Sequence, residues 1–369
     1  MESTIDRFEI KRELYAQTPM IHFQYGENGA TLRASEVKPK LDCYLKTVLV
    51  NNDPELKEDK KLFRRKYGKY LLQKDAFNYT MKIYINNLNR NNMEDISWGG
   101  KGIKKESLIM FDCTIKILCF YPKLKQLIED NIDDFFDIYN FGKLQSKASG
   151  GFTTRENTID TLTDDDIKKI GKNLLNVSGG KTYYYLNNIK LEDAYAFMSA
   201  FCYDMKSDDY SLKYLNDKHL NTNDEYEALY DVLNRCQNHE QVQLYDYVDD
   251  YVFYRALLGL PCSIELSNNK DEKFNVKADK VNKKIQRYHS TVYFKYIHNC
   301  LFIVARKIPK EMYGSSFVMS FNKKSKYRGS IVLKTPKNKN EFNVDEYLDY
   351  FVDLYNKNNS LDIKKGSKL

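Results

Sequence analysis

The stretch FNYTMKIYI, residues 77–85, alternates apolar side chains with mostly polar ones. The apolar set is Phe77, Tyr79, Met81, Ile83 and Ile85. Successive side chains of a β-strand point to opposite faces, so this period of two predicts a strand with one buried face. We take this strand as the starting point for the fold of the first half of the chain.

The elements predicted around this strand complete a recognisable order. In chain order they are a strand at 8–23, a helix at 35–48 with Ser35 as its N-cap, a strand or strand pair at 108–120, a helix at 122–136 and a short strand at 137–141. The order β-α-β-β-α-β is the ferredoxin-like (RRM-like) arrangement. We expect one antiparallel sheet with both helices on one face, burying Leu41, Leu45, Leu127 and Ile128.

The rest of the chain predicts a second part that begins helical and ends rich in strands. We divide the chain into a ferredoxin-like module at 1–160, a mainly helical region at 161–262 and a β-rich second module with a C-terminal helix at 263–369. An apolar stripe at 244–258 predicts a helix in the middle region, and Asn343 is the expected N-cap of the last helix. Strands are expected at 291–297, 301–307, 316–321 and 330–335. The expected fold class is α+β, with two ferredoxin-like modules and a helical insertion between them.

Composition limits the classes of protein that fit. The chain has 369 residues, 42% of them hydrophobic, and its formal net charge of +7 comes from 58 basic and 51 acidic side chains. No apolar run reaches the roughly 18 residues of a membrane span, and the charged N-terminus lacks the apolar core of a signal peptide. We therefore expect a cytoplasmic protein without a membrane partner. The mild excess of positive charge fits an ordinary lysine-rich surface as well as nucleic-acid binding. Clustering of the basic side chains on one face would distinguish nucleic-acid binding from an ordinary surface.

Motifs for metals, cofactors and catalysis are absent from the sequence. The seven cysteines form no Cys-x-x-Cys pair, and the five histidines show no metal-ligand spacing. SGGKT at 178–182 ends like a phosphate-binding loop, but Leu175 stands where the first glycine would be needed. We expect no metal and no cofactor.

The loop GKLQSKASGGF, residues 142–152, is the strongest candidate for a binding site, and we call it the glycine loop. Glycines let a backbone approach a phosphate closely, while lysine, serine and glutamine supply charge and hydrogen-bond donors. The candidate RNA-binding residues are Lys143, Gln145, Ser146, Lys147 and, just beyond the loop, Arg155. The alternative is an ordinary solvated loop.

Two further groups are weaker candidates for RNA binding. Arg33, Lys38 and Lys40 surround the start of the predicted helix at 35–48, where free N–H groups favour anions. Arg287 and His289 flank Tyr288 ahead of a predicted strand, a mixture of charge and aromatic rings that suits single-stranded RNA. The alternatives are an ion pair of Arg33 with a nearby acid such as Glu36, and the ordinary flanking charges of a strand.

These segments resemble the RAMP superfamily of CRISPR effector subunits. The glycine loop looks like the basic loop that follows the second helix in that family, often close to G-K-R-Q-S-K-G-F-G-S-F, and residues 18–41 are similar to the family's first strand, turn and helix. RALLGLP at 255–261 and IQRYHSTVYFK at 285–295 resemble the type III-B (Cmr) branch. Leu144 departs from the arginine common in relatives, which implies weaker RNA binding or contact with a neighbouring subunit.

The resemblance implies an RNA-binding subunit of a type III-like CRISPR ribonucleoprotein complex that acts in antiviral defence. Such a subunit would hold guide RNA by its backbone, contact target RNA and other protein subunits, and leave sequence reading to base pairing. No residue aligns with the loop aspartate or the histidine with which some relatives cut RNA, so no catalysis is expected. Two alternatives stay open: a metal-independent endoribonuclease that processes the guide with His22 or His289, and a structural subunit without RNA contact.

Overall fold

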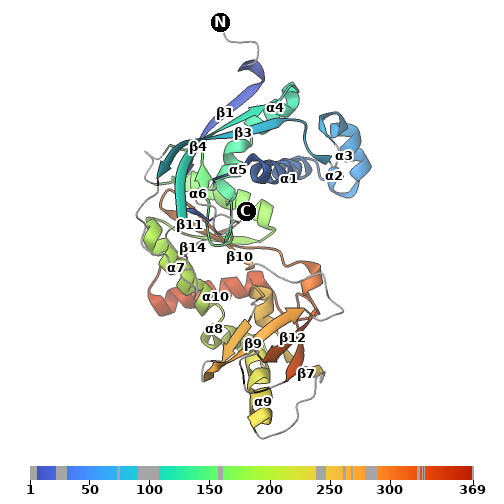
Figure 1. The fold of residues 1–369 in the computed structure, drawn as a ribbon, viewed down its shortest axis with the longest axis vertical. Helices are drawn as coiled ribbons and strands as arrows, with labels where there is room; N and C mark the ends of the chain where they lie inside the picture. The colour runs from blue at the N-terminus through green and yellow to red at the C-terminus, as the bar shows by residue number, and fades with distance from the viewer. Residues whose placement is uncertain are drawn as a thin grey trace.

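The computed structural model describes most of the chain as a series of segments. These are residues 6–21, 31–72, 75–89, 108–156, 161–237, 247–260, 263–266, 269–278, 290–321, 325, 327 and 329–367. An N-terminal sheet, a central sheet and a sheet of inserted strands follow one another along the long axis (Figure 1). None of the helices in these segments combines the length and the apolar character that crossing a bilayer requires.

The N-terminal sheet has the ferredoxin-like strand order. Its strands are β1 (Glu9–Ala16), β3 (Thr80–Asn89), β4 (Leu108–Leu118) and β5 (Phe152–Thr153), with the short β2 (Met20–Ile21) also paired to β4. The spatial order β5-β1-β4-β3 is fully antiparallel, as the β-α-β-β-α-β order requires. The predicted α+β, ferredoxin-like fold class is confirmed for this part of the chain.

Helices α1 (Ala34–Asn52), α4 (Pro122–Glu129) and α5 (Ile132–Ile138) carry the apolar residues of this module. Leu41, Leu45 and Ile128 are fully buried, as predicted, whereas Leu127 is only partly buried. Two short helices, α2 (Glu55–Glu58) and α3 (Lys60–Tyr67), follow α1 at the edge of the module.

Three local predictions for this module are wrong. The helix predicted at 122–136 is interrupted at Asp130 and Asn131 and forms the two helices α4 and α5. The N-cap of α1 is Arg33 rather than Ser35, and no side chain caps this helix end. The segment 137–141 is not a strand, because α5 continues to Ile138 and the fourth strand, β5, begins only at Phe152, the last residue of the glycine loop. The segment is too short for its apolar residues to distinguish a strand from the end of a helix.

The central sheet repeats the same order with strands from distant parts of the chain. It contains β6 (Thr182–Leu186), β10 (Val292–Ile297), β11 (Cys300–Ala305) and β14 (Lys364–Ser367), in the spatial order β14-β6-β11-β10. With α7 (Leu191–Asp204) and α10 (Val344–Asn359), the chain order is again β-α-β-β-α-β. The domain boundaries predicted at 160 and 262 stay a prediction, although strand pairing between β6 and β11 crosses the second of them.

Insertions within the second module build a third sheet. Strands β7 (Tyr247–Val252), β8 (Ser263–Leu266), β9 (Asn269–Ala278), β12 (Ser316–Phe321) and β13 (Ser330–Lys334) pair in the order β7-β13-β12-β9-β8. Helices α8 (Asp208–Asp217) and α9 (Glu225–Gln237) accompany them. The helix predicted at 244–258 is wrong: β7 pairs in parallel with β13, and a 3-10 helix at Tyr254–Leu258 follows it. A short apolar run fits either structure, and here pairing with a distant strand decides.

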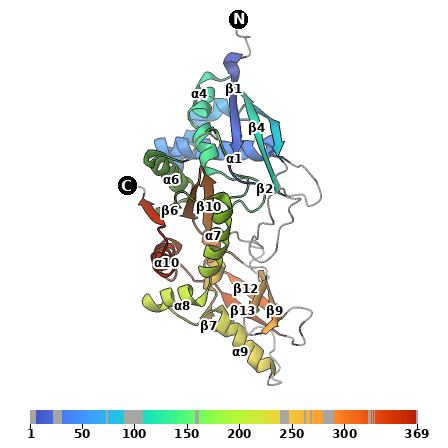
Figure 2. The same ribbon diagram turned by 90° about the vertical axis from the view of Figure 1, so that its left-hand side faces the viewer.

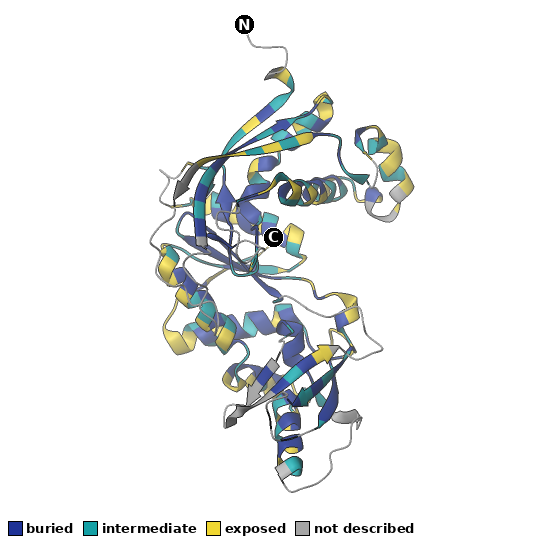
Figure 3. Cartoon of the chain, viewed as in Figure 1, coloured by how far each residue is buried: buried dark blue, intermediate teal, exposed yellow. Residues whose placement is uncertain are grey.

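Strands β10 and β11 are buried on both faces, as the dark blue centre of Figure 3 shows. Alternate residues of β10 pack into two different cores: Phe294 and Tyr296 with α7 and α10, Tyr293 and Ile297 with the N-terminal module and α6 (Asp164–Ser178). Figures 1 and 2 accordingly place these strands between the N-terminal module and helices α7 and α10. The second module is therefore joined to the first across a full sheet face.

Candidate nucleic-acid interface

The glycine loop is clamped to the connection between β1 and β2. The Gly150 N–H donates to the Pro19 carbonyl at 2.9 Å, and the Ser149 hydroxyl donates to the same oxygen at 3.2 Å. The Gly151 N–H donates to the Thr18 hydroxyl at 2.6 Å. These bonds hold the loop backbone in one conformation.

Two glycines of the loop are required by close packing. Gly142 and Gly150 have φ angles of +77° and +67°, which L side chains rarely adopt. A Cβ at Gly142 would lie 2.4 Å from the carbonyl oxygen of Ile21, and one at Gly150 would lie 2.3 Å from that of Phe141. These glycines therefore serve the fold of the loop, whether or not a phosphate also approaches it.

The loop also joins the two modules. The Asn140 side-chain amide donates to the Phe294 carbonyl of β10 and to the Gln145 carbonyl, both at 2.8 Å. In return the Phe294 N–H donates to the Ser146 carbonyl at 3.0 Å. The backbone of the glycine loop thus continues the edge of the central sheet, which sequence reasoning did not anticipate.

Lys40 and Gln145 support the loop from inside. The Lys40 ammonium donates to the Asn140 carbonyl at 3.0 Å and to Gln145 Oε1 at 3.1 Å, and it lies 3.3 Å from Glu36. Gln145 Nε2 donates to the Gly142 carbonyl at 2.8 Å. Burial lowers the pKa of Lys40, and the Glu36 carboxylate opposes this shift. Both side chains are occupied within the protein, so an RNA contact would have to share their hydrogen bonds.

Two other candidate cations are neutralised by carboxylates. Lys38 pairs with Asp42 at 2.9 Å. Arg155 bridges Asp137 at 3.1 Å and Asp166 at 2.7 Å, and so ties α5 to the start of α6. Contact of these residues with RNA stays a prediction, but their ion pairs already give each a role in the fold.

Two lysines of the glycine loop differ from the paired cations described above. Lys143 and Lys147 are half-buried, and neither ammonium pairs with a carboxylate in the part of the chain that the structure describes. Ser146 is half-buried beside them, and Leu144 between them is 40% exposed. Arg33 is exposed at the start of α1. The two lysines are the loop residues best placed to meet a phosphate.

A further lysine, which sequence reasoning missed, lies near Lys147. Lys206, just after α7, donates to the Gly259 carbonyl at 3.3 Å. Burial lowers the pKa of Lys206, and the charge of Lys147 lowers it further. Arg287 and His289 lie outside the described residues, which resume at Ser290 beside Gly259.

Lys295 is a second residue that sequence reasoning missed as part of the junction. It is fully buried in β10, and its ammonium donates to the carbonyls of Phe136 at 2.8 Å, Tyr139 at 2.9 Å and Phe152 at 3.2 Å. Burial lowers the pKa of Lys295 to about 7. The available signal was a single lysine inside the otherwise apolar strand VYFKYI.

Arg255, from the RALLGLP segment, holds the inserted helices together. Its buried guanidinium bonds Asp224 at 2.5 Å and Glu225 at 2.9 Å, and it also bonds Asp208. Burial raises the pKa of Glu225 to about 7. The segment RALLGLP, which resembles the Cmr branch, therefore has a structural role, because its arginine holds α8 and α9 together.

No catalytic cluster emerges from the described segments. Within them, no group of three or more histidine, cysteine or acidic side chains could hold a metal ion. His22 and His289, the candidate acid or base of the ribonuclease alternative, lie outside these segments. The ribonuclease alternative therefore stays a prediction.

The chain is similar to known proteins over its whole length. A family model described as the Cmr1 N-terminal domain matches residues 7–208, and one described as the Cmr1 C-terminal domain matches residues 197–367. Among solved structures, the crystal structure of Cmr1 from Pyrococcus furiosus in its apo form is similar over 97% of this chain and 98% of that chain, with 10% identity and a TM-score of 0.41. No curated protein matches the chain.

Proposed function

The chain belongs to the Cmr1 family of type III CRISPR effector subunits, and on that premise we propose that it holds guide RNA by the phosphate backbone at the glycine loop. The observation that carries this proposal is the contrast among the candidate cations. Lys38, Lys40 and Arg155 are bound within the fold, whereas Lys143 and Lys147 lie on a rigid loop without a carboxylate partner among the described residues. A rigid pair of cations can bind phosphate without first being ordered.

The site suits backbone contact rather than base reading. Lys143 and Lys147 are point charges, and the loop adds the hydroxyl of Ser146 as a donor. Contacts of this kind fix the position of an RNA strand and leave its bases to pair with a target. The neighbouring Lys206 adds positive charge to the same region.

A second role for the loop is a contact with a neighbouring protein subunit. Leu144 is exposed between the two lysines, and φ is +55° there, so the loop presents an apolar side chain outward. Family membership places the chain in a multi-protein complex, which implies protein partners. This contact is the alternative that an RNA assay has to separate from the main proposal.

The proposed role is to hold RNA, not to cut it. The direct test is incubation of the full chain with repeat-containing guide precursor RNA, with and without a chelator. We expect no cleavage. Cleavage that survives chelation and is lost in His22→Ala or His289→Ala would replace this proposal with the ribonuclease alternative.

The binding proposal is tested by the double variant Lys143→Ala, Lys147→Ala. We expect RNA affinity at low salt to fall about tenfold or more, and the salt slope to drop by about one unit per lost phosphate contact. The loss should be similar for all single-stranded sequences, because backbone contacts carry no sequence information. Affinity is measured by fluorescence anisotropy over a salt series, with circular dichroism as the folding control.

A matched control removes two exposed lysines elsewhere, Lys357→Ala and Lys364→Ala in α10 and β14. It has the same change in net charge and should leave the slope almost unchanged. A folded loop variant with wild-type affinity and slope would remove the loop from the RNA site. Loss of assembly with partner subunits in that same variant would then identify the loop as a protein contact.

A further inference from the structure

Helix α3 and the 3-10 helix that follows it form a strongly basic stretch. Residues 60–70, KKLFRRKYGKY, contain six basic and no acidic residues. On the inner side of the helix, the rings of Phe63 and Tyr67 lie with their centroids 5.2 Å apart and pack against the buried core of the N-terminal module. The helix is therefore fixed to this module by its apolar side, and its other side carries the charges.

The basic side chains of this stretch divide into paired and unpaired cations. Arg64 bonds Asp75 at 3.1 Å, and Lys66 bonds Asp53 at 2.5 Å. Three other cations are exposed and pair with no carboxylate among the described residues. We call these three the α3 ridge: Lys61, Arg65 and Lys69.

The arrangement of the α3 ridge does not favour the stability of the helix. Lys61, Arg65 and Lys69 follow one another at intervals of four residues, which places like charges next to each other along one face. Lys61 also lies in the first turn of α3, where the positive end of the helix dipole disfavours a cation. Local stability therefore does not account for these cations, and such a conflict between sequence and stability is typical of a binding site.

The surroundings of the α3 ridge suit a nucleic-acid backbone better than a protein partner. Between Lys61 and Tyr70 no large apolar side chain is exposed. Protein interfaces usually have an apolar centre and contain few lysines, whereas nucleic-acid interfaces are strongly positive. Successive cations of the ridge rise by about 6 Å along the helix, so they form a line of positive charge that several phosphates can follow.

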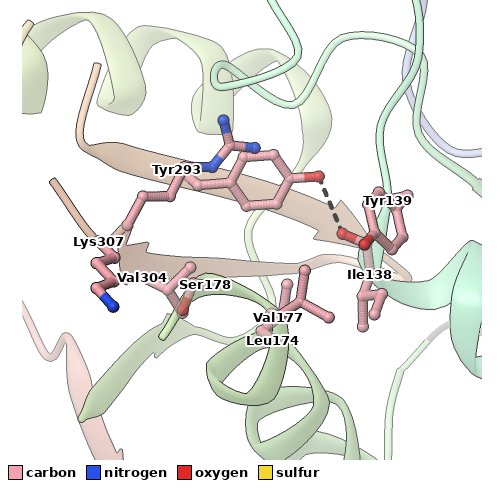
Figure 4. Close-up of a pocket in the computed structure, with 9 residues that line it drawn as sticks. Ile138, Tyr139, Leu174, Val177, Ser178, Tyr293, Val304 and Lys307 are labelled. Carbon is pink, nitrogen blue, oxygen red and sulfur yellow. Dashed lines mark hydrogen bonds between the residues drawn. The ribbon is translucent and has the colours of Figure 1, made fainter. Parts of the chain in front are cut away.

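The α3 ridge lies away from the junction between the two modules. At that junction the Tyr293 hydroxyl donates to the Ile138 carbonyl at 2.9 Å, a contact that joins the modules (Figure 4). Figure 1 places α3 at the outer edge of the N-terminal module, beyond the end of α1. Lys40, which bonds the glycine loop, and Asn52, the last residue of α1, are 12 residues apart, or about 18 Å along the helix axis. The ridge and the glycine loop therefore lie near opposite ends of α1.

We propose that the α3 ridge binds the phosphate backbone of the same RNA strand that the glycine loop holds. This inference rests on the proposed function and adds a second contact region to it. At about 3.4 Å per stacked nucleotide, a strand needs at least about six nucleotides to extend over about 18 Å. A shorter RNA therefore reaches only one of the two regions, and a longer RNA reaches both.

The test compares two double variants of the same helix in the full chain. Lys61→Ala, Arg65→Ala removes two cations of the α3 ridge. The control Arg64→Ala, Lys66→Ala also removes one arginine and one lysine, but these two are ion-paired. Both variants change the net charge by the same amount. Fluorescence anisotropy over a salt series measures the binding of oligoadenylates of about 4 and about 20 nucleotides.

The ridge variant should bind the longer strand about fivefold or more weakly, and its salt slope should fall by about two units, because two phosphate contacts are lost. The control should change this affinity less than about twofold, because its cations are already neutralised. The shorter strand should bind the ridge variant as it binds the wild type, because it occupies the glycine loop alone. The melting temperature of the ridge variant should equal or exceed that of the wild type, because the removed cations disfavour the helix.

Three results would overturn the inference. The first is a folded ridge variant with wild-type affinity and salt slope for the longer strand, which leaves the proposed function standing if Lys143→Ala, Lys147→Ala loses binding. The second is an equal loss in the control, which would reduce the effect to net charge. The third is loss of assembly with partner subunits without a change in RNA binding, which would assign the ridge to a protein contact.

Two further results separate this inference from the proposed function. If the ridge variant loses binding of the longer strand while Lys143→Ala, Lys147→Ala binds RNA as the wild type does, the proposed function fails and the α3 ridge stays an RNA site. If the ridge variant loses as much affinity for the shorter strand as for the longer one, the ridge binds RNA by itself. That result would overturn the single strand shared with the glycine loop.

Discussion

The two ferredoxin-like sheets share one strand order and differ in what covers them. In the N-terminal sheet, helices pack on one face. No helix of the described segments covers the other face, which we call the open face, and two ion pairs lie on it, Glu9 to Lys116 and Lys11 to Glu13, both at 3.0 Å. In the central sheet, β10 and β11 are buried on both faces. RRM proteins stack bases on aromatic side chains of the open sheet face. In this chain one such face carries ion pairs and the other is covered, so the candidate RNA contacts lie at the junction between the sheets.

The sequence of each strand reflects this difference. Strand β4 alternates, with Ile109, Phe111, Cys113 and Ile115 buried and Met110 and Asp112 between them only partly buried; Thr114, which is also buried, is the exception. Strands β10 and β11 read VYFKYI and CLFIVA, an almost unbroken apolar run typical of strands covered on both sides. The exception, Lys295, is the residue whose ammonium is bound by the N-terminal module.

The largest expected effect tests that exception. Lys295→Ala removes an ammonium held by three carbonyls and leaves those acceptors and the space of the side chain unfilled. We expect the free energy of unfolding to fall by about 3–5 kcal/mol. The matched change on the open face, Lys116→Ala, breaks a partly exposed ion pair and should cost at most about 1 kcal/mol. Urea denaturation measures both, and equal losses would contradict the contrast between the faces.

A second, smaller effect concerns pH. Because burial lowers the pKa of Lys295 to about 7, the unfolded chain binds more protons than the folded one between about pH 7 and the ordinary lysine value of 10.5. Stability should therefore rise with pH across this window, by no more than about 1.4 kcal/mol per pH unit for one proton. Lys295→Met keeps an apolar stem of similar length and removes the titrating group. In urea denaturation, the free energy of unfolding of the wild type minus that of Lys295→Met should increase from pH 7.5 to 9.5. A difference that does not change with pH would refute the lowered pKa of Lys295.

Local patterns predicted the elements of the fold well and their partners poorly. The four apolar runs between 291 and 335 all correspond to strands, because strands that are buried on one or both faces have apolar residues at alternate or successive positions. The alternation at 77–85 is only partly borne out: β3 begins at Thr80, after Phe77 and Tyr79, and Ile85 of the predicted buried face is 37% exposed. Strand β6 was missed although its sequence TYYYL favours a strand, because it is only five residues long and its partner β11 lies far away in sequence. Strand β7 was mistaken for helix for the same reason.

The candidate site shows the same limit at the level of side chains. Composition placed Lys143 and Lys147 in a glycine-rich loop, and both stay candidates. It could not separate them from Lys40 and Arg155, because the groups that bind those two come from other segments, such as Asn140 and Asp166. Burial and charge partners are properties of the folded chain. They separate Lys40 and Arg155, which are bound within the fold, from Lys143 and Lys147, which have no carboxylate partner among the described residues.

The smallest expected effect on RNA binding comes from changing exposed side chains on the open face of the N-terminal sheet. Lys82 and Tyr84 on β3 are exposed, Tyr84 by 47%, so this face offers an exposed cation and an exposed aromatic ring. If RNA binds at the junction, the double variant Lys82→Ala, Tyr84→Ala should change RNA affinity less than about twofold and leave the salt slope unaltered, whereas Lys143→Ala, Lys147→Ala lowers both. Fluorescence anisotropy over one salt series compares the two. A loss of tenfold or more in the open-face variant would mean that bases stack on this sheet as in an RRM, because removing one stacking ring costs about 1–3 kcal/mol. The ion pairs of β1 and β4 would then lie beside an RNA-binding surface of the sheet. The junction between the two sheets would then only hold the modules together.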